Sequence, residues 1–166
     1  MEFTATETIQ APRGAVLAAL GDTGYYEHLA TRVTTIEQPE LLGVTVEEGV
    51  VTLSVSYAFA GEITGPAKMV IDQSKLTWVI HTTLDLATHR AVLDIVPDHY
   101  ADLVVAEAEA HFDEHGETTV ETVSGSLEVK IPLFGSSAER VIVDGLLRHL
   151  AAEAAALGEY VAARGS

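Results

Sequence analysis

The chain has 166 residues, no cysteine and a formal net charge of −16, with nine Lys and Arg against 25 Asp and Glu. Its length suffices for a core of its own, so we expect a single domain over residues 1–166. The absence of cysteine excludes disulfides and thiolate chemistry. The basic residues are few and scattered, which makes nucleic acid and anionic membrane surfaces poor partners.

No segment for targeting or membrane insertion is predicted. The first residues lack the basic and apolar regions of a signal peptide, and no run of about 18 apolar residues is present. We therefore expect a soluble, cytoplasmic protein.

The N-terminal part predicts one strand and two short helices. Apolar residues alternate with threonines over residues 3–10, as in a strand. Pro12 ends this strand and suits the first turn of a helix, which Gly21 closes. Asp22 or Thr23 can cap the second helix.

The middle of the chain has a hydrophobic period of two, which predicts antiparallel strands. Residues 51–59 follow a turn at residues 47–49, where Gly49 suits a positive φ. Further alternating segments are residues 76–85 and 91–95.

The strand predicted over residues 103–112 places three successive alanines on its inward face: Ala106, Ala108 and Ala110. The next strand, residues 118–131, has Gly125 inward. A packed sheet favours Val, Ile or Phe at such positions. Small side chains there indicate either a close approach of a covering helix or an open space, and both alternatives stand.

A long amphipathic helix is predicted over residues 137–164. Ser136 and Glu139 fit a capping box at its start, and Gly165 follows its last turn. The apolar stripe that packs on the sheet has as its main members Ile142, Leu146, Leu150, Leu157 and Val161.

Glu153 interrupts this stripe. His149 lies one turn earlier, within reach of an i,i+4 contact, and Tyr160 lies two turns later as a candidate hydrogen-bond donor. The carboxylate either bends out to water or a basic residue at the rim, or turns into a cavity between helix and sheet. In the second case it needs a raised pKa or a hydrogen-bond partner, because an isolated buried carboxylate is costly.

The sequence contains no catalytic motif in the secondary structure that its chemistry requires. Residues 111–115 read H-x-x-E-H, which binds zinc when it lies on a helix, but here the string falls at a predicted hairpin tip. No nucleophile elbow, Walker loop or dinucleotide-binding loop occurs. We therefore expect no catalytic residue, no metal site and no cofactor.

Two segments carry a resemblance to a known superfamily. Residues 3–20 are similar to the opening strand and first helix of the helix-grip (SRPBCC) superfamily, which includes START lipid-transfer domains, the major birch-pollen allergen and bacterial polyketide cyclases. Residues 125–135, running into Ala138 and Glu139, resemble the last strand and helix entry of an uncharacterised actinobacterial family within it, a domain of unknown function.

The resemblance covers nearly the whole chain and implies an α+β fold. A curved antiparallel sheet of about seven strands would wrap around a long C-terminal helix, with two short helices after the first strand and a cavity between sheet and helix. It brings no catalytic residues with it.

We therefore expect a non-catalytic protein that binds a small hydrophobic or amphipathic molecule, lipid-like or polyketide-like, between the sheet and the C-terminal helix, an inference from fold analogy. One alternative is a cyclase- or hydrolase-type enzyme with Glu153 and His149 as its acid–base pair. Another is a co-chaperone-like interaction module with a filled core. The residues expected to line the ligand site are Tyr57, Trp78, Ala106, Ala108, Ala110, Gly125, Leu146, Leu150, Glu153 and Tyr160.

Overall fold

The computed structural model describes residues 1–60, 62, 65–69 and 71–165. Seven strands, three α-helices and two short 3₁₀ segments follow one another in these residues. Their order is β1 (Glu2–Ile9), α1 (Arg13–Leu20), α2 (Thr23–Arg32), β2 (Ile36–Glu47), β3 (Val50–Phe59), η1 (Gly65–Met69), η2 (Gln73–Lys75), β4 (Thr77–Asp85), β5 (Arg90–Pro97), β6 (Val104–His115), β7 (Thr118–Val129) and α3 (Gly135–Arg164).

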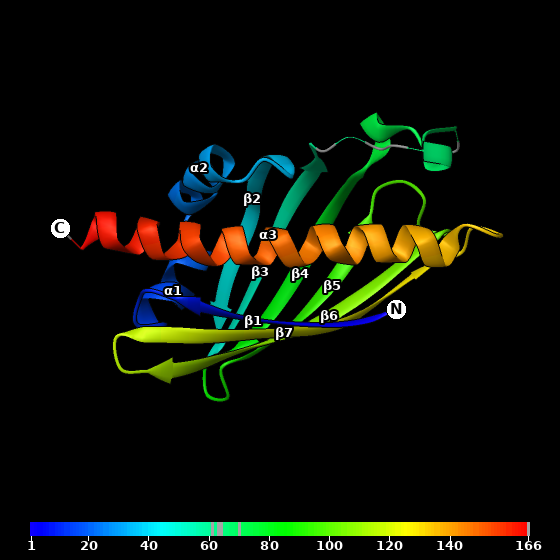
Figure 1. Cartoon of the computed structure of the whole chain (residues 1–166). Coiled ribbons are helices and arrows are strands. Elements are labelled where there is room, and N and C mark those ends of the chain that lie inside the picture. Colours follow the sequence, from blue (N-terminus) through cyan, green and yellow to red (C-terminus); the bar gives the residue numbers. More distant parts are fainter. Residues whose placement is uncertain (61, 63–64, 70, 166) are drawn as a thin grey trace.

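The strands form one antiparallel sheet in the order β1-β7-β6-β5-β4-β3-β2. The sheet curves around α3, which runs across its concave face, while α1 and α2 lie at the end where α3 finishes (Figure 1). The predicted helix-grip fold is confirmed. Within the described residues, no helix combines the length and apolar character needed to cross a membrane.

The predicted bounds of the first short helix and the predicted cap of the second are confirmed. Pro12 is the N-cap of α1 and Gly21 its C-cap. Asp22 caps α2, because its side chain accepts a hydrogen bond from the Gly24 amide at 3.0 Å. These two close turns direct α1 and α2 back over one end of the sheet.

The core occupies that same end of the concave face. One row of inward side chains crosses five strands and is buried throughout: Leu84, Ala91, Ala110, Val123 and Ala5. Nearer the other end, the inward residues Ile80, Ile95 and Ala106 form a row that is only half-buried. The neighbours that continue this row on β3 and β7, Val55 and Leu127, are buried. Burial therefore falls toward the open end along the middle strands β4, β5 and β6.

Helix α3 shows the same gradient along its length. Six of its buried residues lie in the C-terminal half, from Leu150 to Tyr160, and Val143 is the one buried residue before them. In the N-terminal half, Val141 and Ile142 are 71% and 42% exposed. The helix contacts α1, α2, β1 and β7, so it is held mainly by its C-terminal half and by one edge of the sheet.

The predicted capping box at the start of α3 is wrong. The N-cap is Phe134, without a side-chain hydrogen bond. Glu139 instead accepts a hydrogen bond from the Val129 amide at 3.0 Å and lies 3.6 Å from the Met1 ammonium group. The reason is tertiary: the chain turns so tightly after β7 that the free amide at the strand end comes within reach of the first turn of the helix.

Gly125 on β7 marks a close approach, although not that of the helix. The ring of Phe3, its partner on β1, crosses the position where a side chain would stand: a Cβ placed there would lie 2.7 Å from Phe3 Cζ. The same Cβ would lie 2.3 Å from the carbonyl oxygen of Glu107. Glycine is therefore required here by packing.

We expect Gly125→Ala to lower the free energy of unfolding by about 1–3 kcal/mol, the usual cost of overpacking. Urea-induced unfolding measures the change. The control is Gly145→Ala on α3, where a Cβ meets nothing within 4 Å. Alanine there should stabilise the helix by about 0.5–1 kcal/mol. Wild-type stability in Gly125→Ala would contradict the packing described.

Candidate functional site

Polar side chains meet in the interior where α3 passes α2. His149 Nε2 lies 3.6 Å from Glu153 Oε2, which confirms the predicted i,i+4 contact. On its other side, His149 Nδ1 lies 3.0 Å from Thr35 Oγ1, and Tyr25 of α2 donates its hydroxyl to Glu153 Oε1 at 3.3 Å. The His149 and Glu153 side chains are 14% and 20% exposed, so this chain of four polar groups is largely shielded from water.

Tyr160, the predicted donor to Glu153, has a different role. Its hydroxyl accepts a hydrogen bond from Arg164 Nη1, and its ring packs edge-on against Tyr25 with centroids 5.7 Å apart. Tyr25 takes the donor position because α2 packs directly on α3. The candidate donor Tyr160 therefore does not bond to Glu153, and the reason is a helix contact that no local pattern encodes.

The charge of Glu153 affects the pKa of three interior tyrosines. Burial raises the pKa of Tyr25, Tyr26 and Tyr57, and the charge of Glu153 raises each of them further. Each hydroxyl therefore keeps its proton at neutral pH and remains available as a donor.

Two more interior carboxyl groups escaped the sequence prediction. Glu7 on β1 and Glu121 on β7 are direct cross-strand partners. Each lies two residues from a buried inward residue of its own strand, Ala5 for Glu7 and Val123 for Glu121. Because side chains alternate along a strand, both glutamates also point inward. That alternation is the signal that could have found both residues in the sequence.

Glu121 is held mostly in its neutral form. Burial raises its pKa to about 8, and the charges of Glu153 and Glu7 act in the same direction. No hydrogen bond or ion pair joins its carboxyl group to another described residue. Yet Glu121 is only half-buried by its accessible surface. A side chain surrounded by protein atoms that still keeps accessible surface borders a space large enough for a water molecule.

The basic side chains pair elsewhere. Within the described residues, His149 is the one basic side chain paired with Glu153, Glu7 or Glu121. The other ion pairs formed by basic side chains, most of them on the outer surface, are Arg13–Glu114, His28–Glu159, Arg32–Glu159, His111–Asp113, Lys130–Glu128 and Arg164–Asp22.

The predicted lining residues divide by depth. Tyr57 and Trp78 stack on each other, with ring centroids 5.8 Å apart. Trp78, Ala106 and Leu146 are half-buried and face inward at the open end. The remaining apolar candidates are buried, except for Gly125, which is half-buried beneath Phe3: Tyr57, Ala108, Ala110, Leu150 and Tyr160. Their role in ligand binding stays a prediction.

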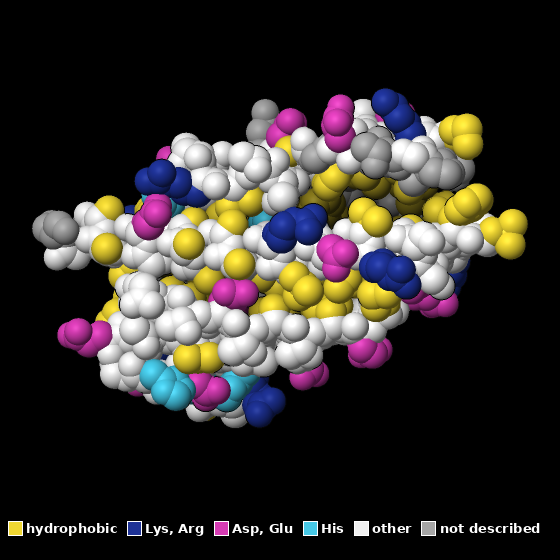
Figure 2. Space-filling view, in the orientation of Figure 1, with side chains coloured by type: hydrophobic (Ala, Val, Ile, Leu, Met, Phe, Trp, Pro, Cys, Tyr) yellow, Lys and Arg dark blue, Asp and Glu magenta, His cyan; other side chains and the backbone are white. Residues whose placement is uncertain are grey.

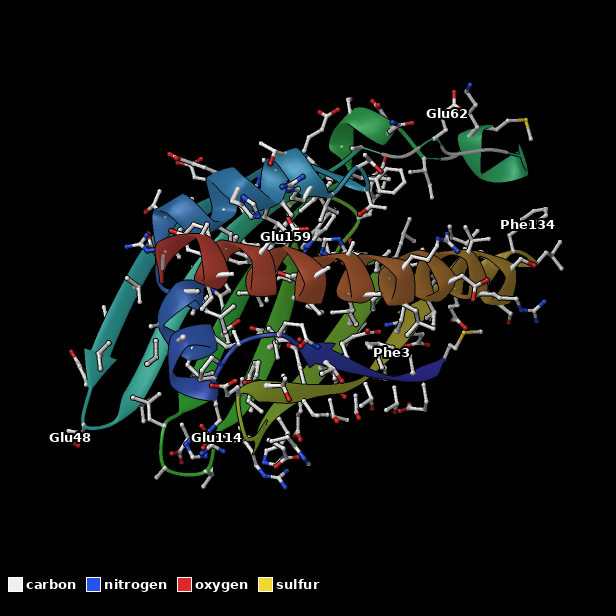
Figure 3. The ribbon with its side chains drawn as sticks, turned by 60° about the vertical axis from the view of Figure 1, so that its left-hand side comes forward. Phe3, Glu48, Glu62, Glu114, Phe134 and Glu159 are labelled. Atoms are coloured by element: carbon white, nitrogen blue, oxygen red, sulfur yellow. The ribbon has the colours of Figure 1, made fainter. Side chains whose placement is uncertain are left out.

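The surface is hollowed at the open end. Figure 2 shows a depression between the N-terminal half of α3 and the segment with η1 and η2, and hydrophobic side chains form its floor. In Figure 3, Phe134 lies at the start of α3, at the end of the molecule opposite the hairpin tips with Glu48 and Glu114. Leu133 and Phe134 are 98% and 49% exposed, so the approach to the hollow is also apolar.

Two further depressions lie away from this space. One, of about 570 Å³, lies on the hairpin of β2 and β3, and its lining includes Thr45, Glu47 and Thr52. The other, of about 300 Å³, lies between α1 and the end of α3, beside Ala15 and Arg164. Neither contains the interior carboxyl groups.

The prediction that the H-x-x-E-H string forms a hairpin tip is wrong, because β6 continues to His115 and includes the whole string. Its histidines share the outward face, and His111 Nδ1 lies 3.1 Å from Asp113 Oδ2. Within the described residues, no group of three or more side chains is arranged to hold a metal ion.

The raised pKa of Glu121 predicts a pH-dependent stability. The folded form binds this proton up to a pH of about 8, whereas an unfolded glutamate loses it near its ordinary pKa of about 4.3. The stabilising contribution is therefore complete below about pH 4 and is lost as the pH rises through 8. Glu121→Gln should be more stable than the wild type by about 2 kcal/mol or more at pH 8.5, and about equal to it at pH 4.5.

Urea-induced unfolding at both pH values measures this difference. Glu109→Gln, on the outward face of β6, is the control and should leave the pH dependence unchanged. A Glu121→Gln variant whose stability follows the wild type at both pH values would contradict the assignment.

Solved structures with the same fold span nearly the whole chain. The Thermus thermophilus protein TTHA0849 is 20% identical, with full coverage of both chains and a TM-score of 0.68. An aromatase/cyclase from a Streptomyces species is 20% identical over 100% of this chain and 96% of its own, with a TM-score of 0.65. Norcoclaurine synthase from Thalictrum flavum is 19% identical with the same coverages and a TM-score of 0.65. At these identities the likeness shows the fold alone.

A search of curated protein sequences finds no significant match. One family profile does match, over residues 4–161, and its description is "Protein of unknown function" (DUF2505). The match covers all seven strands in part or whole and most of α3. The chain therefore belongs to the DUF2505 family, whose fold is that of the helix-grip superfamily.

Proposed function

We propose that this protein binds a small hydrophobic or amphipathic molecule between the sheet and α3 without transforming it. The observation that carries the proposal is the incomplete burial of inward apolar side chains at the open end, notably Trp78, Ile80 and Leu146. These residues lie on the faces that the sheet and helix turn toward each other, where a filled core would bury them.

The energetics favour a ligand at this place. Apolar surface left in contact with water forgoes about 25 cal/mol for each Å² that could be buried. A contiguous apolar hollow with a polar rim is typical of a binding site. The hollow in Figure 2 has a hydrophobic floor, and charged side chains lie on the surface around it.

Fold neighbours support the same class of function by analogy. One is described as an aromatase/cyclase, and norcoclaurine synthase has been solved with dopamine and hydroxybenzaldehyde. Both names concern small organic molecules. Because function depends on the site and not on the fold, this is supporting analogy only.

Filling the space tests the proposal. Ala106→Phe adds a ring on the inward face of β6, whereas the control Val105→Phe adds one on the outward face, where Val105 is 47% exposed. The wild type, purified without detergent, should bind the neutral dye Nile red, and Ala106→Phe should weaken the affinity at least tenfold with little change in melting temperature. Val105→Phe should bind like the wild type.

Two outcomes of this experiment count against the proposal. If the dye binds Ala106→Phe as tightly as the wild type, the site lies elsewhere. If Ala106→Phe loses about 1–3 kcal/mol of stability, the usual cost of overpacking, the space is already filled and the interaction-module alternative gains. Native mass spectrometry of the wild type adds a direct search for a co-purified ligand.

A second candidate function is hydrolysis, and one geometric observation favours it. His149 stands between the Thr35 hydroxyl at 3.0 Å and the Glu153 carboxylate at 3.6 Å. This order of hydroxyl, imidazole and carboxylate is that of an activated nucleophile. Thr35 Oγ1 would attack an acyl carbon and pass its proton to His149 Nδ1, which would return it to the leaving alcohol. Water would then release the acyl group from Thr35.

For this candidate, we expect hydrolysis of p-nitrophenyl esters above the rate of free imidazole. Both Thr35→Val and His149→Gln should reduce it at least 100-fold, because each removes one member of the nucleophile–base pair. His111→Gln on the outward face of β6 is the control and should keep the wild-type rate. Hydrolysis no faster than with free imidazole would exclude this function and leave the four polar groups as a structural network.

The remaining partner classes stay predictions. The net charge of −16 argues against binding to nucleic acid or to anionic membranes. A cytoplasmic location likewise stays a prediction.

A further inference from the structure

We propose that the interior site selects a cation: an amphipathic molecule with a protonated nitrogen at one end of an apolar body. This inference rests on the proposed ligand-binding function and adds the charge and length of the ligand. Two neighbouring features support it. One is the apolar, partly open space between sheet and helix, and the other is a group of interior carboxyl groups without a fixed positive partner.

Three carboxyl groups from three elements lie in one region of the interior. Glu7 and Glu121 are cross-strand partners on the concave face. Glu153 comes from α3, which packs on β1 and β7, and it accepts a hydrogen bond from the Tyr25 hydroxyl of α2 at 3.3 Å. Its charge also contributes to the raised pKa of Glu121. The three groups therefore share one region, at the end of the interior that α1 and α2 close.

A second feature is the absence of a fixed counter-charge. The guanidinium of Arg13, which follows β1 in the chain, has partners elsewhere. It donates a hydrogen bond to the Phe112 carbonyl at 3.3 Å and pairs with Glu114 on the surface. Among the described residues, the basic group facing the carboxyl groups is His149. An interior with three carboxyl groups and one imidazole attracts a cation and repels an anion.

Glu121 distinguishes this region from an ordinary acidic surface, because it offers a ligand an interior carboxyl group without a partner. Its carboxyl group is enclosed, points inward and has no hydrogen-bond or ion-pair partner among the described residues. A buried polar group without a partner costs free energy. A ligand with an N–H donor would supply that partner, and a cationic one would also favour the charged form of the carboxyl group.

A further feature is the distance between the apolar and polar ends. Leu146 at the open end and Glu153 at the deep end lie seven residues apart on α3, or about 10 Å along the helix axis. Between them lies the apolar side chain of Leu150, which is 9% exposed. A chain of ten carbons has nine bonds and is roughly 11 Å long when extended at about 1.25 Å per bond, so it matches this span.

The inferred cation is a molecular one and not a metal ion. Within the described residues no group of three or more side chains is arranged as metal ligands, so the carboxyl groups share a region without converging on one point. A molecular cation attached to an apolar tail fits this spread, because its tail supplies the binding free energy that loose ion pairing does not.

Three ligands of one length test the inference: decylamine, decanol and decanoate. Isothermal titration calorimetry of the wild type at pH 7 should give an affinity for decylamine at least tenfold higher than for decanol, and a still lower affinity for decanoate. The comparison uses the same tail throughout, so it isolates the head group. Equal or tighter binding of decanol or decanoate overturns the inference while the proposed function stands, and no binding of any of the three overturns both.

Proton release gives an independent readout. Binding of an ammonium group should drive off the Glu121 proton, so the apparent binding enthalpy for decylamine should differ between phosphate and Tris buffers by the ionisation enthalpy of up to one proton. The titratable groups facing this region are Glu7 on β1, Glu153 and His149 on α3, Tyr25 and Tyr26 on α2, and Tyr57 on β3.

Variants assign the effect to these groups. Glu121→Gln should abolish the buffer dependence and lower the ratio of the affinity for decylamine to the affinity for decanol. Glu153→Gln should reduce the preference as well, because it removes a second carboxylate but keeps an acceptor for Tyr25. Glu109→Gln on the outer face of β6 is the control. A preference for the amine that survives both interior substitutions would overturn the assignment to this site.

Discussion

The width of the sheet is the constraint on which the rest of the structure depends. Seven strands spaced about 4.8 Å apart make a surface roughly 29 Å across, whereas one helix with its side chains is about 10–12 Å wide. Helix α3 contacts the β1 and β7 edge, so the opposite part of the concave face needs another cover. The helices α1 and α2 provide it at one end, where Leu29, Leu84 and Leu157 are almost completely buried. Nothing equivalent covers the other end within the described residues, and the half-buried Trp78 and Ile80 follow from that geometry.

The interior carboxyl groups lower the stability of the fold, and their position on the concave face of the sheet points to a role in ligand binding. Like charges directly opposite each other on adjacent strands are unfavourable, yet Glu7 and Glu121 are such a pair. The fold tolerates them because Glu121 keeps its proton. An apolar pair at these positions would complete the row that begins with Phe112 on β6. Local violations of packing rules are typical of functional sites, and here the violation occurs on the face that the helix covers.

Much of the fold follows from local patterns in the sequence, whereas the site depends on contacts between distant segments. The alternation around Ala106, Ala108 and Ala110 predicted β6 and its inward face, and the spacing of His149 and Glu153 predicted their contact. The same alternation places Glu7 and Glu121 on the inward face, against the general expectation that charged residues lie outside. Tyr25 could not have been assigned to Glu153, since only the packing of α2 on α3 brings them together. The error at Glu139 has the same origin, because its partner is the distant amide of Val129.

The chain has one tryptophan, and its position makes it a natural spectroscopic reporter. Trp78 stacks on Tyr57 with an interplanar angle of 15°, half-buried at the open end. Indole emission depends on the polarity and mobility of its surroundings, so exchange of water for an apolar molecule beside Trp78 changes its wavelength and intensity. Because no second indole contributes to the signal, the intrinsic fluorescence of the unlabelled protein reads out the state of this one place. Ligands can thus be screened without a dye, a tag or any substitution that alters the interior.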